Sequence, residues 1–106
     1  MNSSKRQRPD LSVAMGPVRL KNPVTVASGC YGYGSNYSDF YDPARLGAIF
    51  LKCVTLKERE GNPPQRLVET PSGLINAIGL QNVGLERFLR EIAPAIQDID
   101  TAFFAN

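Results

Sequence analysis

The sequence contains no histidine and only two cysteines, Cys30 and Cys53. Zinc sites are built from clusters of cysteine and histidine, so a zinc site is excluded, and an iron–sulfur cluster on this chain alone is disfavoured. A Cys–His nucleophile lacks its base, and nothing indicates the secretory context in which a structural disulfide forms. We therefore expect no metal site in this chain.

Long apolar runs and a charge excess are also missing. No run approaches the roughly 20 apolar residues of a membrane span, and no secretory signal is present. The 12 Lys and Arg residues nearly balance the 10 Asp and Glu residues, and Lys5, Arg6 and Arg8 lie in a polar tail. We expect residues 1–10 to form a disordered basic leader. We further expect a soluble, cytoplasmic protein with no membrane or nucleic-acid partner.

Three apolar runs predict parallel strands, and each carries a polar residue at or near its end. Residues 24–29 carry Ser28, residues 48–54 carry Lys52, and residues 101–106 end at Asn106. The middle run is typical of a strand buried on both faces, where a lysine is costly to desolvate unless it meets partners or a ligand cavity. The alternative is that Lys52 extends to solvent at the strand end. Because ligands bind at the carboxyl edge of parallel sheets, these three residues are candidate binding residues.

The segment 76–82, Asn-Ala-Ile-Gly-Leu-Gln-Asn, places two carboxamides on either side of an apolar turn. Asn76 and Asn82 each offer the donors and acceptors needed to bind a planar amide or imide. Gly79 permits positive φ, so successive N–H groups can converge on an anion such as a carboxylate. The alternative interpretation is a plain turn.

The remaining segments predict a helix and a long loop. Apolar residues at helical spacing predict a helix over 85–96, shortened or kinked by Pro94. Residues 55–74 have no helical period and contain three prolines, which favour an extended excursion. Glu58 and Glu60 within it are interpreted as solvated charges, since nothing in the sequence buries them.

The expected element order is strand, helix, strand, long loop, helix, strand, which suits parallel βαβ units. A complete (β/α)₈ barrel needs roughly 250 residues, and three parallel strands alone leave both sheet edges open. We therefore predict an α/β fold in which residues 11–106 form about three β/α units. This is the N-terminal portion of a TIM barrel, truncated after the third strand.

Several motifs in this order resemble the N-terminal third of a class 1 dihydroorotate dehydrogenase, more class 1B than 1A, from about Leu11 to Asn106. The motifs are Asn22-Pro23-Val24, Ala27-Ser28-Gly29, Tyr31-Gly32-Tyr33-Gly34, Leu46-Gly47-Ala48, Leu51-Lys52, Arg59-Glu60-Gly61-Asn62-Pro63-Pro64, Glu69-Thr70-Pro71-Ser72-Gly73-Leu74, the asparagine turn, and Phe104-Ala105-Asn106.

The resemblance implies FMN-dependent oxidation of dihydroorotate to orotate in de novo pyrimidine biosynthesis, with hydride passing from C6 to FMN N5. It implies FMN contacts at Ser28, Lys52, Cys53 and Asn106. It implies substrate contacts at Lys52, Asn76, Ala77, Ile78, Gly79 and Leu80. Cys53 departs from the threonine common at its position. The catalytic base and the FMN phosphate site are expected downstream of Asn106, so residues 1–106 alone are expected to be inactive.

Class 1B membership implies an electron-transfer subunit that carries FAD and a 2Fe–2S cluster and passes electrons to NAD⁺, around a homodimeric core. Class 1A members instead form homodimers and use fumarate. Two alternatives stay open: a related flavin barrel such as a dihydropyrimidine dehydrogenase, and a non-catalytic truncated remnant.

Overall fold

The computed structural model describes residues 8–106. Most of the expected leader, residues 1–7, lies outside the described residues. Residues 8–10 are exposed and adopt no regular secondary structure. None of the helices in residues 8–106 combines the length and the apolar character that crossing a membrane requires.

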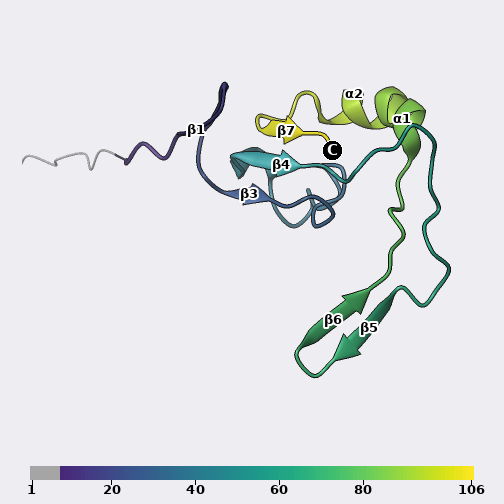
Figure 1. Cartoon of the computed structure of the whole chain (residues 1–106). Helices are drawn as coiled ribbons and strands as arrows, with labels where there is room; N and C mark the ends of the chain where they lie inside the picture. Colours follow the sequence, from purple (N-terminus) through teal and green to yellow (C-terminus); the bar gives the residue numbers. More distant parts are fainter. Residues whose placement is uncertain (1–7) are drawn as a thin grey trace, which may run out of the picture.

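A three-stranded parallel sheet forms the centre of the molecule (Figure 1). Its strands, in spatial order, are β3 (Thr25–Val26), β4 (Ala48–Phe50) and β7 (Ala102–Phe104). The pairing of β4 with β7 continues past the strand ends, because the Val54 N–H donates to the Asn106 backbone oxygen at 2.8 Å. The prediction of three parallel strands is therefore confirmed, and their carboxyl ends lie side by side.

The core lies against the central strand. Leu46, Ile49, Leu51 and Ile96 are at most 4% exposed and form one apolar cluster. An apolar run in the middle of a parallel sheet is buried on both faces, which is why the largest fully buried side chains among residues 8–106 are Ile49 in β4 and Leu51 directly after it. Lys52 directly follows Leu51 in the sequence, so this packing fixes the position of its backbone.

The predicted helix is present but is not regular. Residues 84–96 form a helical run made of α1 (Gly84–Arg87), a π-helical segment (Phe88–Ile92) and α2 (Ala93–Ile96). The Ala93 N–H donates to the Phe88 oxygen, five residues back. Pro94 explains the widened turn, because a proline ring clashes with the carbonyl four residues earlier unless the helix opens there.

The expected helix between the first two parallel strands is wrong. Residues 29–42 form successive turns, followed by one 3₁₀ turn, Pro43–Arg45, in which the Ala44 N–H donates to the Asp42 side chain at 2.9 Å. Gly32 and Gly34 adopt φ of 59° and 98°, in the left-handed region. Glycine favours turns because it permits positive φ, and serine, asparagine and aspartate favour them because their side chains hydrogen-bond to nearby backbone. These local preferences outweigh the βαβ pattern that predicted a helix.

Two antiparallel hairpins were not predicted as strands. The first pairs β1 (Val13–Met15) with β2 (Val18–Leu20), and the second pairs β5 (Leu67–Thr70) with β6 (Gly73–Asn76). The second hairpin lies within and just after the expected excursion 55–74 and projects away from the sheet (Figure 1). All eight of its strand residues are exposed.

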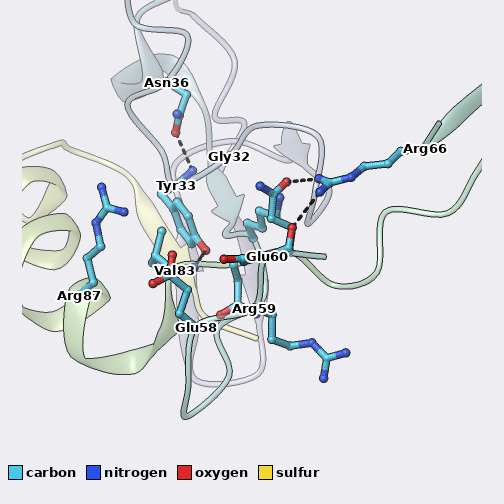
Figure 2. A pocket seen from close by; sticks show the side chains of 12 residues that line it. Gly32, Tyr33, Asn36, Glu58, Arg59, Glu60, Arg66, Val83 and Arg87 are labelled. Atoms are coloured by element: carbon cyan, nitrogen blue, oxygen red, sulfur yellow. Dashed lines mark hydrogen bonds between the residues drawn. The ribbon is translucent and has the colours of Figure 1, made fainter. Parts of the chain in front are cut away.

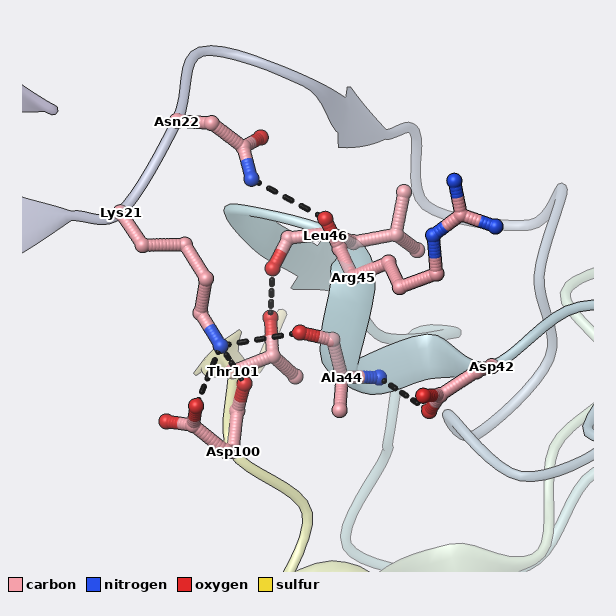
Figure 3. A network of polar contacts seen from close by, with 8 residues as sticks. All are labelled: Lys21, Asn22, Asp42, Ala44, Arg45, Leu46, Asp100 and Thr101. Atoms are coloured by element: carbon pink, nitrogen blue, oxygen red, sulfur yellow. Dashed lines mark hydrogen bonds and ion pairs between the residues drawn. The ribbon is translucent and has the colours of Figure 1, made fainter. Parts of the chain in front are cut away.

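A polar network joins the segments at the amino edge of the parallel sheet (Figure 3). The Lys21 ammonium lies 2.6 Å from the Asp100 carboxylate. The Asn22 side-chain amide donates to the Arg45 backbone oxygen at 3.0 Å, and the Thr101 hydroxyl donates to the Leu46 backbone oxygen at 2.8 Å. These contacts hold β3, β4 and β7 in register at the end opposite the candidate site.

Candidate functional site

A cleft of about 370 Å³ lies where the carboxyl ends of the parallel strands meet the base of the β5–β6 hairpin. Its lining residues are Ser28, Gly29, Lys52, Cys53, Asn76, Ile78, Gly79, Leu80, Gln81 and Asn106. Eight of the nine predicted binding residues are among them, and only Ala77 is not. Residues that are up to 78 positions apart in the chain, from Ser28 to Asn106, thus surround one cavity.

The strand-end wall of the cleft is fixed by hydrogen bonds between neighbouring segments. The Ser28 hydroxyl donates to the Leu51 backbone oxygen at 2.7 Å, which ties the end of β3 to the segment after β4. The backbone N–H of Lys52 donates to the Gly32 oxygen at 2.9 Å. Lys52 is half-buried, and its side chain lines the cleft instead of extending freely to solvent. The strand ends therefore present a cation, a hydroxyl and a carboxamide at one edge.

The opposite wall is a turn with two successive left-handed residues. Gly79 has φ of 81° and Leu80 has φ of 56°. For a residue other than glycine this conformation costs about 1–2 kcal/mol, so the surrounding structure must impose it on Leu80. Within residues 8–106, the backbone N–H groups of Ile78, Gly79 and Leu80 have no hydrogen-bond acceptor. A turn that leaves successive N–H groups free is suited to bind an anion.

Ala77 differs from the other predicted binding residues. Its N–H donates to the Arg66 backbone oxygen at 2.8 Å, and its own oxygen accepts from the Asn62 side-chain amide at 3.0 Å. Both backbone groups are therefore engaged by the preceding loop. The structure places Ala77 in the same turn, without bringing it to the surface of the cleft.

The expectation that Asn82 binds a ligand alongside Asn76 is wrong. Asn82 is 4% exposed, and its side-chain oxygen accepts from the backbone N–H groups of Thr55 and Gly84 at 3.0 and 2.9 Å. Its amide donates to the Leu80 oxygen and to the Thr55 hydroxyl, both at 2.9 Å. These bonds use the hydrogen-bonding capacity of the carboxamide inside the protein. Asn82 is structural, whereas Asn76 is exposed and lines the cleft.

A second, more charged cleft of about 550 Å³ (Figure 2) shares Lys52 with the first cleft. Its charged lining residues are Lys52, Glu58, Arg59, Glu60, Arg66 and Arg87. The Arg66 guanidinium donates to the Gln81 side-chain oxygen and to the Glu60 backbone oxygen, both at 2.9 Å (Figure 2). Glu58 and Glu60 are exposed. Among residues 8–106, no three His, Cys, Asp or Glu side chains gather closely enough to hold a metal ion.

Two residues of the first cleft were missed by the sequence analysis, Gly29 and Gln81. Gly29 directly follows Ser28 at a strand end, and Gln81 directly follows Leu80 in the asparagine turn. Adjacency to predicted binding residues was the available signal. It is weak, because neighbouring residues in a turn need not face the same side.

Comparison with known proteins identifies the family of this chain. A sequence model of the family "Dihydroorotate dehydrogenase" matches residues 10–105. The chain belongs to the dihydroorotate dehydrogenase family.

Relatives in this family carry names of two types. A relative from Aquifex aeolicus, named for dihydroorotate dehydrogenase A (fumarate), is 56% identical over 97 residues, which are 92% of this chain and 32% of the relative. A relative from Bacteroides thetaiotaomicron, named dihydroorotate dehydrogenase B (NAD(+)), catalytic subunit, is 54% identical with the same coverage. The chain thus spans about a third of the length of these dihydroorotate dehydrogenases.

A solved structure supports the fold assignment. The DHODH from Eimeria tenella, crystallised with ferulenol, superposes with a TM-score of 0.67 at 21% identity and covers 97% of this chain and 30% of that one. At that identity the match concerns the fold alone. The predicted fold class is confirmed: the chain is an α/β portion of a TIM barrel, built on three parallel strands.

Proposed function

We propose that this chain supplies one side of the cleft in which an FMN-dependent enzyme oxidises dihydroorotate to orotate, a step of de novo pyrimidine biosynthesis. The observation that carries the proposal is the convergence of eight predicted binding residues on one cleft at the carboxyl edge of the sheet. Ligands bind at this edge in parallel α/β folds and TIM barrels. Family membership and the relatives' names support the same reaction.

On the substrate side, three kinds of group in the cleft match the chemistry of orotate. The Lys52 ammonium supplies a fixed positive charge for the carboxylate, and the free N–H groups of Ile78, Gly79 and Leu80 supply donors to the same anion. The Asn76 carboxamide can pair with the imide edge of the pyrimidine ring, because it offers both a donor and an acceptor. A ring without that edge would leave the amide unpaired, which disfavours it.

On the cofactor side, the strand-end residues fit a flavin. Gly29 has φ of 83°, and a β-carbon placed there would meet no atom within 4 Å, so a flat ring can approach the backbone. Lys52, Ser28 and Asn106 place a cation, a hydroxyl and a carboxamide beside it, and Cys53 contributes a small polarizable group. FMN bound there would supply the redox chemistry, accepting at N5 the hydride from C6 of dihydroorotate. The role of this chain's residues is to bind and orient.

The general base is assigned to none of the cleft residues of this chain. Lys52 serves as a positive charge, and Cys53 lies at a position that the family uses for flavin contact. By resemblance, the base and the phosphate site follow Asn106 in the sequence. We therefore expect a protein limited to residues 1–106 neither to turn over dihydroorotate nor to retain stoichiometric FMN during gel filtration.

For electron transfer we propose the class 1B arrangement, in which a homodimeric catalytic core pairs with a subunit that carries FAD and a 2Fe–2S cluster. The support is the B (NAD(+)) catalytic-subunit name of several relatives. Turnover with NAD⁺ by the complex purified from its native source is the expected result. Turnover with fumarate by the catalytic subunit alone would instead assign the class 1A arrangement.

The deciding experiment is anaerobic reduction of the flavin in the purified native gene product. Dihydroorotate is expected to bleach the FMN absorbance, whereas dihydrouracil, which lacks the carboxylate, is expected to do so far more slowly. Bleaching by dihydrouracil alone would assign a dihydropyrimidine dehydrogenase. A product that contains no flavin and responds to neither compound would identify a non-catalytic remnant.

A further inference from the structure

Asn62 lies in the loop before β5 and does not line the cleft, yet it holds the turn that does. Its backbone N–H donates to the Ile78 oxygen at 2.9 Å, and its side-chain amide donates to the Ala77 oxygen at 3.0 Å. One residue therefore fixes two successive carbonyl groups of the turn. The turn has no other hydrogen bond to these two oxygens within residues 8–106.

Because the peptide bond is planar, the direction of each of these two carbonyl groups determines the direction of the N–H group that follows it. In a planar trans peptide the C=O and the following N–H point in opposite directions. Because the Ala77 oxygen is directed toward Asn62, the Ile78 N–H is directed away from it. Because the Ile78 oxygen is also directed toward Asn62, the Gly79 N–H is directed away as well. Ile78 and Gly79 line the cleft, whereas Asn62 does not.

The contact between the two segments is tight enough to make this orientation specific. A β-carbon added to Gly79 would lie 2.6 Å from the Asn62 backbone nitrogen and 2.8 Å from its side-chain Cγ and Oδ1. Asn62 therefore packs directly against Gly79. The orientation of the turn thus depends on direct contact with Asn62.

We propose that Asn62 is a positioning residue, which orients the Ile78 and Gly79 N–H groups toward the carboxylate of the substrate. The proposal rests on the proposed function, since it requires that the cleft bind a carboxylate-bearing pyrimidine. Asn62 itself touches neither substrate nor cofactor. Its side-chain amide acts through the Ala77 carbonyl, and its backbone N–H acts through the Ile78 carbonyl.

The test compares Asn62→Ala with Asn22→Ala in the native gene product loaded with FMN. Asn22 is a matched control, because its amide also donates to a backbone carbonyl, that of Arg45 at 3.0 Å, but at the opposite edge of the sheet. In Asn62→Ala, the KM for dihydroorotate and the Kd of orotate, measured from the flavin spectrum, are expected to rise about tenfold. The kcat and the FMN content are expected to stay within about twofold, because the interaction lost is ground-state binding.

The outcomes separate this proposal from the one on which it rests. A wild-type protein that binds no orotate overturns the proposed function. A wild-type protein that binds orotate, with an Asn62→Ala variant equal to Asn22→Ala, overturns the role of Asn62. If Asn62→Ala does not fold, Asn62→Asp keeps the side-chain shape but removes the donor to Ala77, and the same rise in KM is expected. A fall in kcat or in FMN content with unchanged KM would show a general structural role and overturn the proposal.

Discussion

Replacing Gly79 with alanine adds a single methyl group to the turn proposed to bind the substrate carboxylate. Gly79 adopts φ of 81°, and the new β-carbon would lie 2.6 Å from the backbone nitrogen of Asn62. Both features resist the substitution: the left-handed conformation is unfavourable for alanine, and a backbone atom cannot move aside as a flexible side chain can. We expect the turn to be displaced from Asn62 while the parallel sheet keeps its fold.

The magnitude follows from the contacts that the displacement breaks. The left-handed conformation costs about 1–2 kcal/mol for alanine. Moving Asn62 away forfeits its two hydrogen bonds to the turn, each contributing about 1 kcal/mol net. The turn is therefore destabilised by about 3 to 4 kcal/mol if it keeps its native shape, and by less if it relaxes. Since each 1.4 kcal/mol is a factor of ten, we expect the Kd of orotate to rise between about 10-fold and 100-fold.

The assay is orotate titration of the FMN-loaded native gene product, followed through the flavin spectrum. Gly73→Ala is the matched control, because Gly73 lies in β6, the strand that leads into the turn, has no positive φ, and offers open space to a β-carbon. The control is expected to bind orotate within about twofold of wild type. Equal orotate affinity in the Gly79 and Gly73 variants would refute the reasoning, because the close contact would then have no part in binding.

Three further predictions concern other positions. Asn82→Ala is expected to lower the free energy of unfolding, measured in denaturant titrations, by about 2–4 kcal/mol, because it leaves the Thr55 and Gly84 N–H groups without an acceptor. A free energy of unfolding within about 0.5 kcal/mol of wild type would contradict the structural role of Asn82. Lys52→Met is expected to weaken orotate binding by more than about tenfold in the same flavin titration; unchanged affinity would remove Lys52 from the anion site. Hydrogen bonds, first from Arg87 and then from Arg90, lower the pKa of Glu91 below its usual 4.5. The stabilisation that the ionised Glu91 carboxylate gives the folded protein is therefore present above pH 4.5 and is lost as the pH falls through the folded-state pKa. Glu91→Gln should therefore melt at a lower temperature than wild type at pH 7 but not near pH 2, and a difference that persists at low pH would count against this ion pair.

The parallel sheet could be predicted from the sequence because it depends on apolar patterning. The run 48–54 consists mostly of apolar residues, and such a run predicts a strand that is buried on both faces. The carboxyl edge followed from the direction of the strands, which placed Ser28, Lys52 and Asn106 together. The turn 76–82 was noticed from its own residues, but its placement beside the strand ends came from the resemblance to a known family, because no local pattern encodes that long-range contact.

The failures have a different physical origin. The segment between β3 and β4 was expected to be a helix, but its conformation is decided by turn residues and positive-φ glycines. The β5–β6 hairpin has no buried face, so the alternation that normally reveals a strand is missing. The role of Asn82 was misjudged because a carboxamide that binds a ligand and one that holds a loop are identical in sequence. Only its burial and its four hydrogen bonds distinguish them.

The two walls of the cleft are stabilised by different interactions. The strand ends follow directly from the apolar cluster around Ile49 and Leu51, so hydrophobic burial holds the residues proposed to contact the flavin. The turn 76–80 belongs to an exposed excursion. It is held in place by the side-chain amides of Asn62 and Asn82 and by the Arg66 backbone oxygen, which accepts from the Ala77 N–H. Core substitutions should therefore affect cofactor and substrate binding together. Substitutions in the polar contacts should affect substrate binding alone, because they leave the packing beneath the flavin intact.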